Sequence, residues 1–265
     1  MTSLAIAGIG VCATGMADWT QAQPILRATA AMPLQPLPRL APECLPPLER
    51  RRANATARLA ISAAAQAVAG MPQGDVSSMA TIFSTSDGDG EVLASMLAAL
   101  AQPEVVLSPT LFHNSVFNAP AGYWSIGAGA HAASITVSAG AASFVAGLKE
   151  AHWQVLSTGA PVLYVAFDAP FPAALTSFER SAEPFACAFC LRPGDSSAFG
   201  CIDALTDDPP AKESDDVPPV ELLARFAGNA AAAALPLLRA IAHRRRACVP
   251  LPYLDSSNLW LNYLP

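Results

Sequence analysis

Short apolar segments that favour strands alternate with helix-forming segments along most of this chain. The strand-type segments cover residues 3–9, 79–84, 133–138, 161–167 and 185–191. Helical segments cover 51–68, 91–101, 141–156 and 220–246, the last with a break expected at Pro236. This alternation predicts a layered α/β fold. Because only 14% of the residues are charged and 52% are apolar, we expect helices on both faces of the sheet.

The composition also limits the partners and the cellular setting. The formal net charge is −6, and only two short arginine runs occur, so a nucleic-acid partner is not expected. Six cysteines without disulfide-type spacing favour a reducing cytoplasm. The apolar start, residues 3–12, lacks a basic leader and is too short to span a bilayer, so we expect neither secretion nor a membrane anchor.

Two proline-rich stretches interrupt the pattern. Residues 21–47 hold seven prolines and are predicted to form a loop. Residues 203–219 combine charge with proline and are predicted to form a linker. The expected organisation is therefore a domain over 1–202, the linker, and a C-terminal helix and tail over 220–265.

The residues that could carry chemistry on their own form no convincing set. Cys187 and Cys190 lie three apart in an apolar run without a second pair, which favours buried packing cysteines over redox or metal use. The segment 87–90 (Asp-Gly-Asp-Gly) lacks the ligands of a calcium loop. We therefore predict no metal and no cofactor.

The order of several motifs resembles the N-terminal half of β-ketoacyl synthases, the condensing enzymes with a thiolase-like fold. The opening strand runs into Gly-Ile-Gly at 8–10, and the second strand ends in glycines at 88 and 90. Ser-Pro follows at 108–109, then Asn-Ala-Pro-Ala-Gly at 118–122, then a strand and a turn into a helix. The resemblance covers roughly residues 3–200 and implies the N-terminal half of that fold, a layered α/β structure with a mixed sheet.

Aligned on Asn118 and Gly122, the resemblance places Ala141 where a synthase has its nucleophilic cysteine. A shift of one or two residues would bring Ala139, Gly140, Ala142 or Ser143 there, and of these only Ser143 could attack a thioester. In a synthase, a cysteine at this helix N-terminus has its thiolate favoured by the helix dipole. The two histidine patterns of the synthase second half, His-Gly-Thr-Gly-Thr and Asn-x-Phe-Gly, do not occur in the sequence.

The chain closely resembles the short chain-length-factor family of synthase-like proteins from aryl polyene and xanthomonadin-type pigment clusters. This resemblance implies a non-catalytic subunit that pairs with a full-length β-ketoacyl synthase and meets acyl carrier protein through that complex, in a pathway related to polyketide and fatty acid biosynthesis. The family's dimer strand corresponds to Ser134, Ile135, Thr136, Val137 and Ser138. A sheet edge rich in β-branched residues also needs a partner on physical grounds.

The same resemblance places Asp87 near the distal end of the partner's acyl tunnel, where it would limit chain length together with Asn114, Ser115 and Phe117. An aspartate before glycine can equally form a turn or cap a helix, and both interpretations stay open.

Two other functions remain as alternatives. One is a stand-alone thioester hydrolase or decarboxylase that uses Cys187, Cys190 or His113. The other is a self-associating, acyl-binding scaffold.

Overall fold

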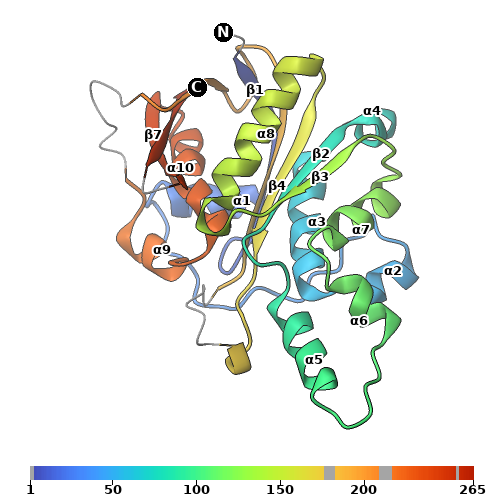
Figure 1. Cartoon of the computed structure of the whole chain (residues 1–265). Helices are drawn as coiled ribbons and strands as arrows, with labels where there is room; N and C mark the ends of the chain where they lie inside the picture. Colours follow the sequence, from blue (N-terminus) through green and yellow to red (C-terminus); the bar gives the residue numbers. More distant parts are fainter. Residues whose placement is uncertain (1–2, 176–182, 209–216, 255–256) are drawn as a thin grey trace.

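A computed structural model describes residues 3–175, 183–208, 217–254 and 257–265. Within these residues, eight strands form one sheet in the order β3-β2-β4-β5-β1-β6-β8-β7 (Figure 1). β2 runs parallel to β3 and β4, and the remaining pairs are antiparallel. The predicted α/β class with a mixed sheet is confirmed. The strand bounds are β1 Leu4–Ala13, β2 Ala80–Ser84, β3 Ser134–Val137, β4 Val162–Asp168, β5 Phe185–Pro193, β6 Cys201–Thr206, β7 Ala247–Pro252 and β8 Asn258–Leu264.

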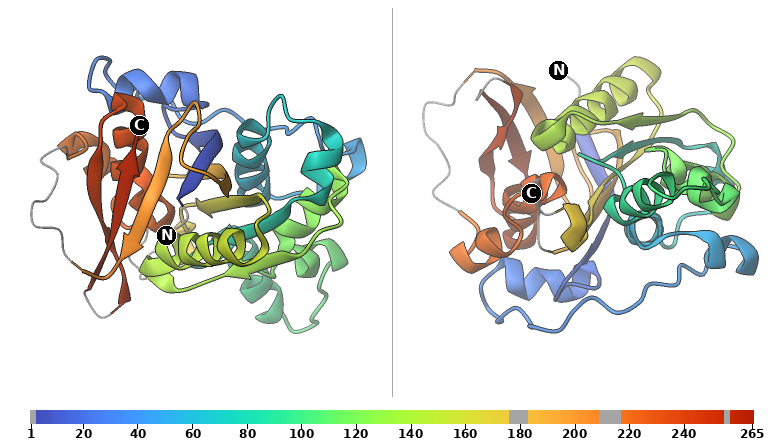
Figure 2. Two further views of the ribbon diagram at one scale, coloured as in Figure 1. Left: turned by 90° about the horizontal axis from the view of Figure 1, so that it is seen from above. Right: turned by 60° about the horizontal axis from the view of Figure 1, so that its bottom comes forward.

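Helices cover both faces of the sheet, as predicted (Figures 1 and 2). α3 and α7 pack on one face, and α1, α8 and α10 pack on the other. The α-helix bounds are α1 Trp19–Leu26, α2 Pro47–Arg52, α3 Ala55–Ala67, α4 Gln73–Ser78, α5 Gly90–Leu100, α6 Pro109–Asn114, α7 Ala119–Ala128, α8 Ser143–Thr158, α9 Val220–Arg225 and α10 Leu235–His243. The 3-10 turns are η1 Gly140–Ala142, η2 Ala173–Leu175 and η3 Ala230–Ala234.

The central strands are buried on both sides, so their side chains alternate between two apolar cores. In β4, Tyr164 lies in the core under α8, whereas Val165 lies in the core under α3. α3 approaches β1 very closely. A Cβ atom on Gly8 or Gly10 would lie 1.9 Å from a carbonyl oxygen of α3, so only glycine fits at these two positions. The small side chains of α3 and these glycines together set the spacing between helix and sheet.

The predicted loop over 21–47 is wrong at its start. α1 extends to Leu26 and includes Pro24, because Asp18 accepts a hydrogen bond from Gln21 at the helix start and Ile25 and Leu26 are buried. Tertiary burial of one apolar face outweighs the lost donor of Pro24.

The predicted division after residue 202 is also wrong for the residues that the structure describes. Residues 203–206 of the expected linker continue β6, which pairs with β1 and β8. Residues 209–216 of that linker lie outside the described part. The expected tail adds β7 and β8 to the same sheet, so 220–265 shares the sheet of the preceding domain.

The predicted helical segment 220–246 is interrupted before Pro236, where the break was expected. The interruption lies at 226–229, where Gly228 has φ +78° and the Asn229 side chain accepts hydrogen bonds from two amides of η3. Pro236 instead lies in the first turn of α10, where a proline costs no helical hydrogen bond.

Candidate functional site

The carboxyl ends of three parallel strands, β3, β2 and β4, meet at one edge of the molecule. The loop after β2, residues 85–89, lies between the turn after β3 and the end of β4. The Ser138 hydroxyl donates a 2.8 Å hydrogen bond to the backbone carbonyl of Ser86 and joins the first two segments. Sites in α/β proteins commonly form at such strand ends, and we call this region the strand-end site.

The turn between β3 and α8 has the geometry that the sequence predicts around Ala141. η1 reverses the chain with Gly140 at φ +55°, and α8 begins directly afterwards. Ala141 is exposed at this turn, at the start of a 16-residue helix. The side chain at this position is a methyl group, which cannot act as a nucleophile.

Ser143, the other candidate nucleophile, is part of the turn itself. Its side chain is 1% exposed. Its hydroxyl accepts a hydrogen bond from the Ala139 amide at 2.9 Å and donates one to the Gly140 carbonyl at 2.7 Å. A hydroxyl that is buried and already engaged in this way is poorly placed to attack a thioester.

Asp168, at the end of β4, is the buried charge of the site and was not singled out from the sequence. Its carboxylate accepts hydrogen bonds from the Thr85 hydroxyl at 2.8 Å, the Ser86 amide at 2.8 Å and the Ala231 amide at 3.2 Å. Burial raises the pKa of Asp168 to about 6, although the hydrogen bonds oppose this shift. The sequence signal that could have identified Asp168 is an aspartate at the end of an otherwise apolar strand. Through these hydrogen bonds, Asp168 connects the end of β4 to the loop that follows β2 and to η3.

Asp87 lies next to this charge. It accepts a 2.6 Å hydrogen bond from the Ser86 hydroxyl and lines a small void with Asp168, Phe171 and Asn229. The helix-capping interpretation of Asp87 is wrong, because Asp89 caps α5 by accepting from the Val92 amide at 2.8 Å.

The structure brings Phe117 close to Asp87 and gives Asn114 and Ser115 local roles. A Cβ on Gly88 would lie 2.6 Å from the Phe117 ring, so the ring lies directly over this glycine. Asn114 is buried, donates to the Arg52 carbonyl at 2.9 Å and accepts from the Tyr123 hydroxyl at 3.0 Å. Ser115 donates to the Phe112 carbonyl at 2.8 Å. Asn114 and Phe117 line one small cavity with Gly88.

β3 is an edge strand, and its outer side faces no other strand among the described residues. The carbonyls of Ala133 and Val137 accept hydrogen bonds from the amides of Thr81, in β2, and Thr85, just after it, at 3.0 and 3.2 Å. Alternate residues of a strand face the same neighbour, so Ser134 and Thr136 turn their backbone groups toward the open side. Ile135 is 37% exposed. Ser138, the last residue of the expected dimer strand, lies just beyond the strand.

A set of exposed apolar side chains continues from this edge. α5 and the loop after it extend past the end of the sheet, and we call α5, this loop and α6 the apolar arm (Figure 1). Six large apolar side chains of the arm are 43% to 72% exposed: Leu93, Leu97, Leu100, Val105, Val106 and Phe112.

The residues proposed for a stand-alone enzyme are not brought together. Cys187 and Cys190 lie on β5 in the cores of opposite sheet faces, and burial raises the pKa of both thiols, that of Cys190 to about 11. The His113 ring contacts the Tyr123 ring edge-on, with the ring centroids 5.4 Å apart. The described residues contain no group of three or more His, Cys, Asp or Glu side chains that could hold a metal ion.

Residues 17–248 match the sequence profile of the β-ketoacyl synthase N-terminal domain. The chain belongs to this family. The β-ketoacyl synthase match extends beyond residue 202, in agreement with the sheet, which continues past the predicted domain boundary. A search of curated protein sequences gives no match.

Solved structures of β-ketoacyl synthases and of their complexes share the thiolase-like fold of this chain. One is the ketosynthase ApeO in complex with its chain length factor ApeC from Xenorhabdus doucetiae, with a TM-score of 0.71, 23% identity and 99% of each chain covered. Another is the ishigamide ketosynthase/chain length factor, with a TM-score of 0.79, 12% identity and coverage of 98% of this chain and 99% of that one. A β-ketoacyl synthase from Burkholderia phymatum is matched over 78% of this chain and 64% of its own, with a TM-score of 0.64 and 13% identity.

None of the described helices is both long and apolar enough to cross a membrane.

Proposed function

We propose that the chain is a non-catalytic, chain-length-factor-type subunit that pairs with a full-length β-ketoacyl synthase and shapes the acyl tunnel of that enzyme. The observation that carries the proposal is the turn at Ala141. It combines a tight strand-to-helix turn with an exposed methyl group at the nucleophile position, and the neighbouring Ser143 hydroxyl is buried and doubly hydrogen-bonded. A turn of this kind keeps the local backbone shape of a synthase site but has no nucleophile, so a partner synthase would have to supply the nucleophile.

Two surface features support pairing. The open side of β3 offers unpaired backbone donors and acceptors, which soluble proteins normally cover or pair. The apolar arm adds large exposed side chains beyond the strand ends, and an apolar surface of this kind is typical of protein interfaces. We infer that the partner synthase covers both.

A role in setting chain length rests on Asp87 and Phe117. Both lie at the strand-end site beside the open edge of β3, and Phe117 is 44% exposed. A charged carboxylate near the end of an apolar tunnel would oppose entry of further methylene groups because desolvating the charge is costly. We propose that Asp87 and Phe117 limit the product of the partner, with Asn114 and Ser115 holding the segment that carries Phe117.

By resemblance, the partner would make an aryl polyene-type acyl chain and receive its substrates from an acyl carrier protein. Co-expression with a synthase encoded beside this chain, followed by size-exclusion chromatography, tests the pairing. A stable one-to-one complex supports it. A homodimer that persists when the synthase is present would instead favour the self-associating scaffold.

A further inference from the structure

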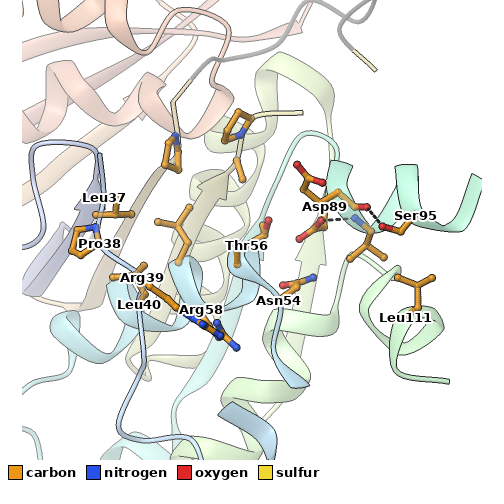
Figure 3. Close-up of a pocket in the computed structure, with 17 residues that line it drawn as sticks. Leu37, Pro38, Arg39, Leu40, Asn54, Thr56, Arg58, Asp89, Ser95 and Leu111 are labelled. Carbon is orange, nitrogen blue, oxygen red and sulfur yellow. Dashed lines mark hydrogen bonds between the residues drawn. The ribbon is translucent and has the colours of Figure 1, made fainter. Parts of the chain in front are cut away.

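A cavity of about 450 Å³ lies between the start of α3 and the start of α5 (Figure 3). Its walls come from the loop before α2, the start of α3, the start of α5, α6 and the segment after β4. The volume is within the range of small-molecule sites. No step of the proposed function uses this cavity.

Most of the wall is apolar, and the leucines come from three separate segments. Leu37 and Leu40 belong to the loop before α2, Leu59 to α3 and Leu111 to α6. Val92 of α5 is buried in the same wall. These side chains form a surface that suits a hydrocarbon body.

Two arginines, Arg39 and Arg58, line the same cavity (Figure 3). The structure gives neither guanidinium an ion pair with a carboxylate among the residues it describes. Arg58 donates through one terminal nitrogen to the Arg50 carbonyl at 2.8 Å, but its Nε is buried without a hydrogen-bond partner. Burial, and then the charge of Arg39, lowers the pKa of Arg58. Arg58 thus carries a partly buried charge beside the like charge of the exposed Arg39, a costly arrangement that an anion would relieve.

The acidic residues of the cavity do not provide this relief. Asp89 lies across the cavity from the arginines in Figure 3, and its carboxylate caps α5 through the Val92 amide. Glu91 is exposed in the first turn of α5. Neither acts on Arg58 strongly enough to offset the effect of burial and of Arg39 on its pKa.

We propose that this cavity binds an amphipathic anion, with a carboxylate or phosphate head between Arg39 and Arg58 and an apolar body against the leucine wall. The inference goes beyond tunnel shaping, because it assigns to this chain a ligand site of its own. The proposed binding requires only this chain, so it can be tested on the isolated protein. A failure of ligand binding would leave the proposed pairing with a synthase intact.

Isothermal titration calorimetry on the purified full chain tests the proposal with probes that share a ten-carbon tail. Decanoate and decyl phosphate, below their micelle concentrations, should bind to one site. Decanol and decylamine should bind at least about tenfold more weakly, because they offer no anion to the arginines. If decanoate and decyl phosphate differ, the tighter one identifies the head group.

Arg39→Gln is the main variant, because Arg39 is exposed and its loss should not unfold the chain. It should weaken decanoate binding by about tenfold or more. Arg58→Gln should do the same, with its fold checked by circular dichroism since it also bonds α2. Arg51→Gln, an exposed arginine of α2 outside the cavity, is the matched control and should bind as the wild type does. Equal affinities for decanoate and decanol, tighter binding of decylamine, or unchanged binding by Arg39→Gln would each overturn the proposal.

Discussion

The Ser138 hydroxyl donates a 2.8 Å hydrogen bond to the Ser86 carbonyl, which ties the end of the open edge strand to the loop that carries Asp87. A partner that pairs with β3 therefore meets the loop after β2 next to the paired strand. This contact is the physical link between the two parts of the proposed function, pairing and control of chain length.

Ser138→Ala should loosen that link without unfolding the chain, because Ser138 is exposed and follows the strand. We expect a loss of about 0.5–1.5 kcal/mol in the free energy of unfolding, the usual contribution of one hydrogen bond. Urea unfolding measures it. In the complex with the synthase, the product distribution should broaden; an unchanged distribution would show that the link does not matter for chain length.

Asp87→Leu should lengthen the products of the partner synthase, because it replaces a charge at the distal tunnel end with an apolar side chain. Mass spectrometry of the products measures the shift, and loading of the synthase with acyl groups should stay at the wild-type level. Asp75→Leu, an exposed aspartate of α4, is the control. Identical products from the two variants would remove Asp87 from the account.

Asp168 should make stability depend on pH. Its folded pKa of about 6 lies above the ordinary value of 3.8, so folding favours the protonated carboxyl. The contribution of Asp168 to stability is therefore fully present below about pH 4 and is lost as the pH rises through about 6. The full change is about 3 kcal/mol.

Asp168→Asn cannot titrate, so the difference in unfolding free energy between pH 4.5 and pH 7 should become smaller than in the wild type. Urea unfolding at the two pH values measures this difference. The variant should also lose some stability at low pH. The side-chain NH2 group of the introduced asparagine would face the backbone N–H of Ala231, which now donates to the carboxylate of Asp168. A pH dependence equal to that of the wild type would assign the titration to other groups.

Thr136→Pro should abolish pairing with the synthase while the chain stays folded. The backbone of Thr136 faces the open side of β3, and a proline at such an edge position costs no bond to β2. Ile135→Pro is the contrasting variant, because the backbone groups of Ile135 face β2, as those of Ala133 and Val137 do, and a proline there should destabilise the sheet itself. Size-exclusion chromatography with the synthase and circular dichroism separate the two effects. A complex that survives Thr136→Pro would place the interface elsewhere.

The parts of the fold that the sequence predicted are those with strong local patterns. β3 and the turn at Ala141 follow from β-branched residues before Ala139 and Gly140, and β4 follows from a continuous apolar run. β7 was missed because Pro250 and Pro252 argue against a strand, whereas the structure places them on an edge strand where proline is tolerated.

The site was less predictable because its contacts join distant segments. Asp168 has no local motif, and its role depends on the amides of Ser86 and Ala231, which lie far away along the chain. The apolar sequence of α5 indicated a helix, but not that its leucines are exposed on the apolar arm, because exposure depends on which helices cover the sheet.

Intact-mass spectrometry of the purified complex, after incubation with acyl-loaded carrier protein, tests whether this chain is a non-catalytic subunit. We expect an acyl mass increase on the synthase and none on this chain, because Ala141 offers no nucleophile and the Ser143 hydroxyl is engaged in the turn. A stoichiometric acyl adduct on this chain, or turnover of acyl thioesters by this chain alone, would contradict it.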